Sequence, residues 1–485
     1  MPAFAVNNIT ADMLFEMERE LAEPRFAGVP IGFTLGDMLA IHLLDGNYDW
    51  SLKNMVRDLL GCVFHFMARS SGRPMDGKGM QDKVLFTWIY DRQSLRDMVL
   101  PLVQAIGPEN CVVFGSNPVM REKLPAGAMF LAWSDVPGSD TGPWRREFVR
   151  CLRSWLPKMV TVCRRHGVTL RILPLLVKYL VIHSRRVLAC GCLLDQLRPK
   201  MVVTEFDRNA MASCLVLAAR ERGLRTSTLV HGVINPPHGY TPVLADQIFC
   251  WGEHQRRQLM EMGTSPRKVL KTGAPHISNF IGVDSLLVRK RMRIDLSTPV
   301  VMLATSPVKD IDRRILAETF CEALTKTILV GVVRLHPSEK LEFYANLARA
   351  YPAVRFLANG VLTIDEAMAV SDVVCCHDSS FGHEAVIKGK SVVVLDVLST
   401  PLRGGLELVD SAGCPRVSSS QNLAAELQHI AGDEEYRRRL LERLQQYVKD
   451  NYTAFGSEAV DNIVAALRTG SMLGSAPAAQ SMEVS

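Results

Sequence analysis

Short apolar runs alternate with helical segments over most of this chain, and this alternation restricts its fold more than any other feature. Six such runs, from VLFTWIY to QIFCWG, fall between residues 84 and 252, and five more follow the charged stretch Arg289 to Arg293. Strands that alternate with helices form parallel sheets with helices on both faces. The sequence therefore predicts an α/β chain with two Rossmann-like halves, joined near residues 282–298.

Chain length agrees with more than one domain. Single cores stop growing near about 250–300 residues, and this chain has 485. We expect a helical N-terminal region at 1–82, ending in a glycine-rich polar loop at 70–82, and an N-terminal Rossmann-like domain at 83–285. A C-terminal Rossmann-like domain at 286–468 and a disordered tail at 469–485 complete the predicted organisation.

Charge and cysteine usage narrow the class of protein. The net charge of +6 is mild, and acidic residues are interspersed throughout, unlike the basic face of a nucleic-acid binder. Such a charge suits an anionic substrate or an anionic membrane surface. The 12 cysteines lie mostly inside apolar runs and lack CxxC spacing, which is typical of reduced cysteines in a cytosolic protein.

The N-terminus and the most apolar segment bear on localisation. The first residues contain acids where a signal peptide needs a basic start and an apolar stretch. The most apolar long segment, Leu170 to Leu194, is interrupted by ionisable residues that are costly at the centre of a bilayer. We therefore expect a cytoplasmic protein, with at most a peripheral association with the inner membrane at its cytoplasmic face.

Polar side chains follow several predicted strands at the point where each strand ends. Ligands of open parallel sheets bind at these carboxyl ends. The residues concerned are Glu205, Asp207 and Arg208 after MVVT, His231 and Gly232 after STLV, His336 and Pro337 after GVVRL, and His377, Asp378, Ser379 and Ser380 after DVVCC. Helix capping or loop hydrogen bonds explain any single one. Their joint occurrence favours a nucleotide site.

The segment HDSSFGHEAVIKGK carries the strongest of these signals. Ser379 and Ser380 fall at the predicted start of a helix, where free N–H groups and the helix dipole bind phosphate. Glu384 follows one turn later and is predicted to accept hydrogen bonds from a ribose, and His383 beside it is a further candidate. An ordinary capped turn is the alternative.

Two loops are further candidates for contacts with phosphate. They contain Gly273, in Thr272 to Pro275, and the pair Thr305 and Ser306. Glycine and proline in such loops also shape turns without binding anything. Neither a DxD motif nor zinc-ligand spacing follows a strand, so we expect no metal, and the absence of GxGxxG argues against a nicotinamide dehydrogenase.

The motifs together resemble those of GT-B glycosyltransferases. His336-Pro337 with the downstream serine pair is similar to the motifs of bacterial capsule and lipopolysaccharide enzymes: polysialyltransferases, Kdo transferases and CDP-glycerol glycerophosphotransferases. The resemblance covers roughly residues 200–465. It implies two Rossmann-like domains that face each other across a cleft, with the nucleotide sugar bound chiefly by the C-terminal one.

The resemblance also implies roles for individual residues. Glu205 or Asp207 would act as general base, and His336 would stabilise the departing phosphate. Thr305, Ser306, Pro337, Ser379, Ser380 and Glu384 would bind the donor, with Arg208, His231, Gly232, Gly273, His377 and His383 as other candidates in the cleft.

The implied function is transfer of a sugar from a nucleotide donor to a glycan, lipid-linked or protein acceptor, in the synthesis of surface polysaccharide or glycoconjugate. A CMP-sugar of the Kdo or sialic acid type is the preferred donor, and no cofactor or nucleic acid partner is expected. The alternatives are a CDP-glycerol-type glycerophosphotransferase, an isomerase resembling UDP-N-acetylglucosamine 2-epimerase, and a nucleotide-sugar-binding scaffold without activity.

Overall fold

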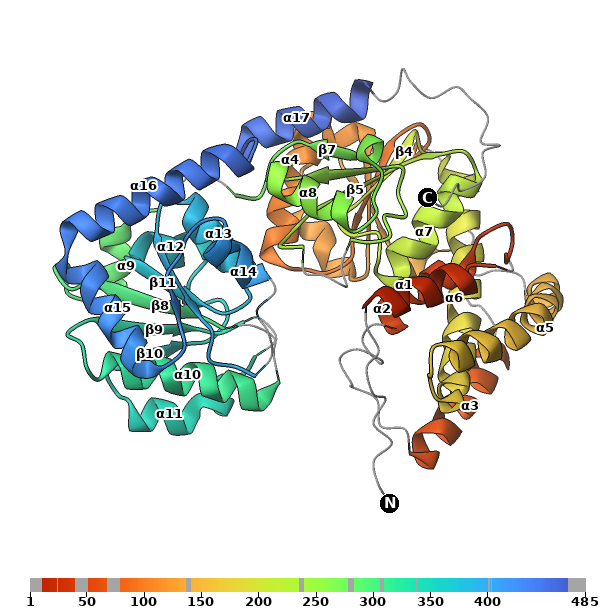
Figure 1. The fold of residues 1–485 in the computed structure, drawn as a ribbon. Coiled ribbons are helices and arrows are strands. Elements are labelled where there is room, and N and C mark those ends of the chain that lie inside the picture. The colour runs from red at the N-terminus through yellow and green to blue at the C-terminus, as the bar shows by residue number, and fades with distance from the viewer. Residues whose placement is uncertain are drawn as a thin grey trace. The chain divides into compact units, whose positions relative to one another are not determined.

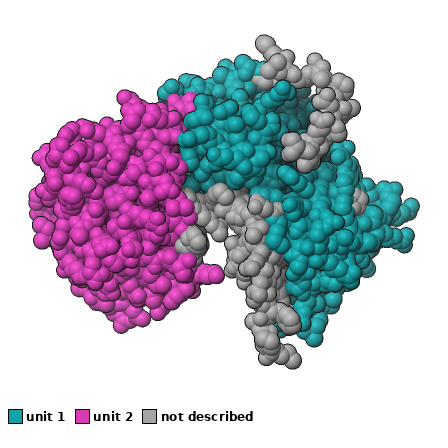
Figure 2. Space-filling model, viewed as in Figure 1, with its two compact units in different colours: residues 1–276, 454–485 teal, residues 277–453 magenta. Residues whose placement is uncertain are grey.

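The computed structural model describes residues 11–23, 25–39, 51–67, 79–136, 141–234, 240–277, 283–305, 309–336, 339–399, 402 and 404–469. The chain divides into two compact units (Figure 2). Unit 1 contains residues 1–276 and 454–485, and unit 2 contains residues 277–453. Each unit is built on one parallel sheet, as the alternation of apolar runs predicts.

Unit 1 holds a seven-stranded parallel sheet in the order β3-β2-β1-β4-β5-β6-β7 (Figure 1). Its strands are β1 (Val84–Trp88), β2 (Cys111–Gly115), β3 (Met129–Ala132), β4 (Met201–Thr204), β5 (Arg225–Leu229), β6 (Gln247–Cys250) and β7 (Val269–Lys271). Val84 pairs with Cys111 of β2 on one side and with Met201 of β4 on the other. The strand order therefore reverses between β1 and β4, where the carboxyl ends of the strands leave a ligand-binding crevice in folds of this kind.

The helices of unit 1 form its N-terminal region and cover its sheet. They are α1 (Ala11–Leu21), α2 (Gly36–Leu39), α3 (Leu52–Met67), α4 (Gln93–Ile106), α5 (Thr141–Arg165), α6 (Leu173–Leu197), α7 (Ala210–Glu221), α8 (Glu253–Glu261) and α17 (Gly456–Thr469). The long helix α6 contacts both α3 and α7, and so joins the N-terminal helices to the sheet (Figure 1).

Unit 2 holds a six-stranded parallel sheet in the order β10-β9-β8-β11-β12-β13. Its strands are β8 (Val300–Ala304), β9 (Val330–Arg334), β10 (Val354–Leu357), β11 (Val373–Cys376), β12 (Ser391–Leu395) and β13 (Arg416–Val417). The strands β8, β11 and β12 are buried along their whole length, because helices cover both faces of the sheet. Here the strand order reverses between β8 and β11.

The helices of unit 2 follow its strands along the chain. They are α9 (Ser285–Arg291), α10 (Asp310–Leu324), α11 (Ala345–Ala350), α12 (Ile364–Val370), α13 (Ser380–Ile387), α14 (Gly404–Asp410), α15 (Ser420–Gly432) and α16 (Glu434–Asn451). Helices α15 and α16 pack against each other, and their apolar faces join the core of the sheet through Leu423, Leu427 and Leu444.

The last helix belongs to unit 1 rather than to the C-terminal domain predicted at 286–468. Val460, Ile463, Val464 and Leu467 of α17 pack into the core around α4 and β1. The amphipathic pattern predicts this helix but does not identify the sheet against which it packs. The predicted disordered tail lies outside the described residues beyond Thr469.

No helix among the described residues is long and apolar enough to cross a membrane. Leu170 to Leu194, the most apolar stretch, falls mostly in α6, where its apolar side chains pack within unit 1.

Candidate functional site

The carboxyl edge of the sheet in unit 2 collects several predicted donor-binding residues. Thr305 directly follows β8, His336 lies two residues after β9, and Ser379 lies three residues after β11. These three strands are neighbours in the sheet, with β8 in the middle and the reversal of strand order between β8 and β11. The three residues therefore lie at the edge where ligands of such sheets bind.

A buried hydrogen-bond network fixes the turn that contains His336. The Thr305 hydroxyl accepts from the His336 backbone N–H at 2.8 Å and donates to Glu339 Oε2 at 2.6 Å. The Tyr344 hydroxyl donates to the same Glu339 oxygen at 3.1 Å, and Arg313 Nε lies 3.6 Å from Glu339 Oε1. Thr305 therefore supports the turn, rather than presenting its hydroxyl to a ligand. Ser306 and Pro337 lie outside the described residues.

Ser379 begins helix α13 in the predicted way. Its side chain accepts a hydrogen bond from Phe381 N at 3.3 Å, which makes it the N-cap, and Ser380 is the first helical residue. Both serines are half-buried. The first turn of α13 carries the positive end of the helix dipole.

Arg334, the last residue of β9, adds a positive charge beside this turn. Its guanidinium carbon lies 5.3 Å from the centre of the Phe381 ring. The side chain is half-buried and has no hydrogen bond or ion pair with any residue that the structure describes. Burial lowers the pKa of Arg334, and the carboxylate of Glu384 opposes this effect. An unpaired guanidinium beside a helix N-terminus suits an anion.

Sequence analysis did not single out Arg334. The sequence contains one signal for this residue: Arg334 is a charged residue at the end of the apolar strand β9, directly before Leu335 and His336.

Three further candidates of unit 2 are buried. His377 is 2% exposed, and its Nδ1–H donates to the carbonyl of Leu395 in β12 at 2.8 Å. His383 is 3% exposed, with Nδ1 at 3.1 Å from the Tyr452 hydroxyl. Both histidines hold elements of unit 2 together, so we no longer assign them to the donor. Glu384 is buried as well, near Arg334.

In unit 1 the side chain of Glu205 lies where the strand order reverses, between β1 and β4. Its Oε1 accepts from Ile89 N at 2.7 Å, and its Oε2 accepts from the hydroxyl of Thr87, so the carboxyl group bridges the two strands. The side chain is 1% exposed. Burial raises the pKa of Glu205, and the hydrogen bonds from Thr87 and Ile89 partly offset this. Both carboxylate oxygens of Glu205 are therefore engaged by the protein.

Asp207, the other predicted base, holds the loop that precedes β6. Its Oδ2 accepts from Leu244 N at 2.7 Å and from Ala245 N at 2.8 Å, and the residue is fully buried. Burial raises the pKa of Asp207, and the hydrogen bond from Ala245 N acts in the opposite direction. Helix α7 is capped instead by Asn209, whose side chain accepts from Met211 N and Ala212 N.

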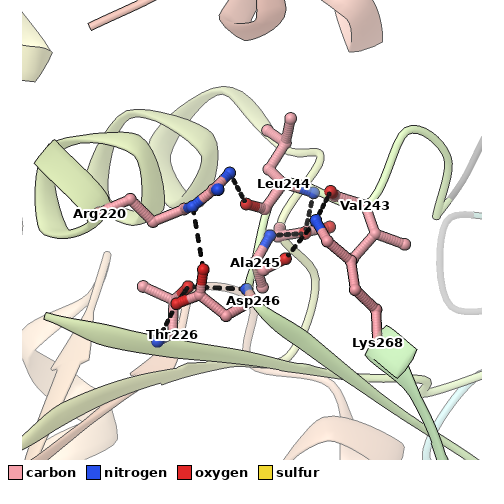
Figure 3. A network of polar contacts seen from close by, with 8 residues as sticks. Arg220, Thr226, Val243, Leu244, Ala245, Asp246 and Lys268 are labelled. Carbon is pink, nitrogen blue, oxygen red and sulfur yellow. Dashed lines mark hydrogen bonds and ion pairs between the residues drawn. The ribbon is translucent and has the colours of Figure 1, made fainter. Parts of the chain in front are cut away.

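The loop at residues 243–246 has further polar supports (Figure 3). Lys268 Nζ donates to the carbonyls of Val243 and Ala245 at 3.3 and 3.1 Å, and Arg220 donates to the carbonyl of Leu244 at 2.9 Å. Asp246 accepts from the Thr226 hydroxyl at 2.8 Å. Asp207 thus belongs to a network that fixes this loop.

Arg208 is also a structural residue. Its Nη2 lies 2.6 and 2.7 Å from the two carboxylate oxygens of Glu18, and both side chains are buried. This ion pair fastens α1 to the turn after β4, so the structure gives Arg208 a structural role within unit 1.

Gly273 is required by packing. Its φ is +100°, and a Cβ built there would lie 2.3 Å from the carbonyl oxygen of Ala454, where the chain returns to unit 1. Ala274 N donates to the same carbonyl at 2.9 Å. The glycine permits this close contact and is not needed to explain a phosphate site.

His231, after β5, is the candidate in unit 1 whose geometry suits proton transfer. Its Nδ1 lies 2.9 Å from the carbonyl oxygen of Glu205. A carbonyl can only accept, so Nδ1 carries the hydrogen and Nε2 carries the lone pair. Nε2 has no hydrogen-bond partner among the described residues. Burial lowers the pKa of His231 to about 4, so the ring is neutral at pH 7.

Aromatic neighbours hold the ring of His231 in place. The Tyr240 hydroxyl accepts from the backbone N–H of His231 at 2.9 Å and lies 2.9 Å from Nδ1 as well. The Phe206 ring packs edge-on at 5.6 Å between centroids. A Cβ built on the adjacent Gly232 would have no atom within 4 Å, so there is open space beside the histidine.

Among the described residues, no group of three or more His, Cys, Asp or Glu side chains is arranged to hold a metal ion.

Comparison with known proteins identifies the fold. No protein-family model and no curated protein sequence matches the chain. A glycosyltransferase from Rickettsia africae is similar in structure, with a TM-score of 0.53, 10% identity, and coverage of 81% of this chain and 100% of that one. The UDP-GlcNAc 2-epimerase of Neisseria meningitidis gives a TM-score of 0.50 at 15% identity, covering 80% of this chain and 100% of its own. The wall teichoic acid polymerase TagF gives a TM-score of 0.50 at 11% identity, with coverage of 87% of this chain and 99% of TagF. The chain therefore has an α/β two-domain fold of the GT-B type.

Proposed function

We propose that this chain is a glycosyltransferase that takes a sugar from a nucleotide-activated donor, and that unit 2 binds the donor. The observation that carries the proposal is the guanidinium of Arg334, which lies beside the N-terminal turn of α13 and has no hydrogen bond or ion pair with a described residue. Together they offer a positive charge and the positive end of a helix dipole at the carboxyl edge of a parallel sheet, which is the chemistry that binds a nucleotide phosphate. His336 lies at the same edge, on a turn that Thr305 and Glu339 support.

The reaction breaks the bond between the anomeric carbon of the sugar and the phosphate oxygen of the nucleotide. That oxygen gains negative charge, and Arg334, the first turn of α13 and His336 stabilise it. The acceptor hydroxyl forms the new bond to the anomeric carbon and loses its proton. These residues supply the charge stabilisation without a metal, so activity is expected to persist in EDTA.

His231 replaces Glu205 and Asp207 as the proposed acceptor of this proton. Both carboxylates are buried: Glu205 accepts hydrogen bonds through both oxygens and Asp207 through Oδ2, while Asp207 Oδ1 has no partner among the described residues. Nε2 of His231 also has no hydrogen-bond partner in the described part of the chain, but open space lies beside this residue. A pKa of about 4 keeps Nε2 unprotonated at neutral pH.

Within the nucleotide sugars, we propose a CMP-activated acidic sugar as donor, and a glycan, lipid-linked or protein acceptor in surface polysaccharide or glycoconjugate synthesis. Net charge supports an anionic substrate, and the His336-Pro337 and serine motifs support this donor class. Structures of similar fold contain UDP-GlcNAc in the Neisseria epimerase and UDP-glucose in Anabaena HepE, so UDP-sugars are the first alternative. Product analysis with UDP-GlcNAc separates transfer from epimerisation.

Calorimetric titration of the full chain with CMP, CDP, UDP and GDP tests the donor site. One nucleotide should bind, and Arg334→Met should weaken it by roughly ten- to a hundredfold, the value of a hydrogen bond to a charged group. Arg439→Met is the matched control, because this arginine is also in unit 2 and is 64% exposed. Equal affinity in the two variants would remove Arg334 from the site.

A second experiment tests the base. His231→Gln should lower turnover by roughly a hundredfold or more and leave nucleotide affinity unchanged. Asp207→Asn removes an ionisable group from the same unit and should retain most turnover, because an amide oxygen can accept from Leu244 N and Ala245 N. The reverse pattern would restore Asp207 as the base.

A further inference from the structure

Helix α3 exposes an unusual amount of apolar surface. Its residues Leu52, Val56, Leu59, Leu60, Val63, Phe64 and Met67 are each between 46% and 74% exposed. They recur at spacings of three and four, so they form one stripe along the helix. At 100° per residue, the stripe spans an arc of roughly 140°. A contiguous exposed apolar stripe of this kind marks an interaction surface.

The orientation of α3 is the opposite of that of an ordinary surface helix. Its acidic residue, Asp58, is buried against the protein and lies 2.9 Å from Nζ of Lys178 on α6. The apolar residues point away from the protein, and the exposed Lys53 and Arg57 fall at one margin of the apolar stripe. The buried ion pair therefore fixes the helix with its apolar face outward.

Positive charge surrounds this surface. Together, α3, α5 and α6 contain 12 Lys and Arg residues but only three Asp and Glu residues. Several lie close to α3: Arg145 donates to the carbonyl of Met67 at 3.2 Å, and its guanidinium lies 5.6 Å from the Phe66 ring. Burial, and after it the charges of Lys178, Arg185 and Arg186, lower the pKa of His65.

We propose that the exposed face of α3 docks onto the surface of an anionic lipid bilayer. A helix with an outward apolar stripe and basic residues at its margin and behind it suits the interface of a membrane. Its apolar side chains lie among the acyl chains, and its cations lie at the lipid phosphates. A second copy of the chain suits this face less well, because a symmetric contact through α3 would bring two basic surfaces together. Binding needs no nucleotide sugar, so this proposal stands or falls independently of the proposed function.

Co-sedimentation with lipid vesicles tests the proposal on the full chain. Wild type should sediment with phosphatidylcholine vesicles that contain about 30 mol% phosphatidylglycerol, and much less with phosphatidylcholine alone or at high salt. The double variant Leu60→Glu, Phe64→Glu should lower binding at least about tenfold, because it places two charges within the stripe. Ile328→Glu is the control, since Ile328 is 93% exposed in unit 2 and lies far along the chain from α3.

Two further measurements distinguish membrane docking from misfolding and from self-association. Unfolding of the double variant, followed by tryptophan fluorescence, should match that of wild type, because both substituted side chains are exposed. Light scattering should show the same mass for both proteins in solution. Equal binding to neutral and anionic vesicles, unchanged binding of the double variant, or a dimer that the double variant dissociates would each overturn the proposal.

Discussion

The buried ion pair between Glu18 and Arg208 offers the sharpest test of the correction made to Arg208. Glu18→Gln leaves the Arg208 guanidinium without its counter-charge in an environment where the two side chains are 2% and 6% exposed. Removing one partner of a buried pair costs about 3–5 kcal/mol, because the remaining charge stays desolvated. Unit 1 should therefore lose about this much free energy of unfolding.

Tryptophan fluorescence measures this loss in unit 1 alone. All six tryptophans of the chain lie between residues 50 and 251, and so belong to unit 1. The midpoint of thermal unfolding should fall by roughly 5–10 °C. Glu20→Gln is the control on the same helix. Glu20 Oε2 lies 2.7 Å from Nη1 of Arg165, which is 61% exposed, and such pairs contribute about 0–1 kcal/mol. The other oxygen lies 3.2 Å from Nε2 of His166, a contact that the glutamine amide can also make.

The comparison has a clear negative outcome. Equal midpoints for Glu18→Gln and Glu20→Gln would show that the Arg208 pair does not fasten α1 to the sheet. Arg208 would then be available to a ligand, as the sequence first suggested. Nucleotide affinity of Glu18→Gln, measured in the same preparation, should be unchanged if unit 2 alone binds the donor.

Three further predictions concern individual residues. Gly273→Ala should lower the unfolding midpoint of unit 1, measured by tryptophan fluorescence, because the new Cβ would meet Ala454 O and the φ of residue 273 is +100°. Gly232→Ala should leave the midpoint unchanged, because its Cβ would have no atom within 4 Å. Unit 1 should lose stability as pH falls from about 6.5 toward about 4, because the unfolded chain protonates His231 before the folded one does, and His231→Gln should reduce this slope. Glu339→Gln should destabilise unit 2 by about 1.5–3 kcal/mol in calorimetry, because it removes the charge that accepts two hydroxyl hydrogen bonds.

The alternation of apolar runs predicts most of both sheets. Each of the 11 runs corresponds to a strand, because a strand buried on both faces needs a continuous apolar segment. The runs omit β7 and β13, which are edge strands of three and two residues. So few residues cannot produce a period that distinguishes a strand from a loop.

Position at a strand end is readable from sequence, but the direction of a side chain is not. Ser379 is the predicted N-cap because capping depends only on local spacing. His377 lies two residues earlier and turns inward to Leu395 O, which is 18 residues away in the chain. The same limit applies to Arg334 and Asp207, because their neighbours come from other strands and loops and cannot be predicted from the residues around them in the chain.

The two sheets share a pattern of strand order, and in unit 1 the side chain of Glu205 lies at the point where that order reverses. In unit 1 this side chain bridges β1 and β4, so the crevice that would receive a ligand is occupied by the protein itself. Burial raises the pKa of Glu205 above its ordinary value of 4.5, so its contribution to stability is present below that value and declines as pH rises through the raised pKa.

Glu205→Gln keeps both bonds, because an amide can accept from Ile89 N and donate to the Thr87 hydroxyl, and it removes the ionisation. Its unfolding midpoint by tryptophan fluorescence should equal or exceed that of wild type at pH 7.5, with the advantage shrinking as the pH falls toward 4.5. Glu205→Leu has a similar size but leaves Ile89 N–H buried without an acceptor, which should cost about 1–3 kcal/mol at every pH. If the glutamine and leucine variants were equally destabilised at pH 7.5, an ionised carboxylate would be needed at this position. Glu205 would then be a candidate for the base that we propose at His231.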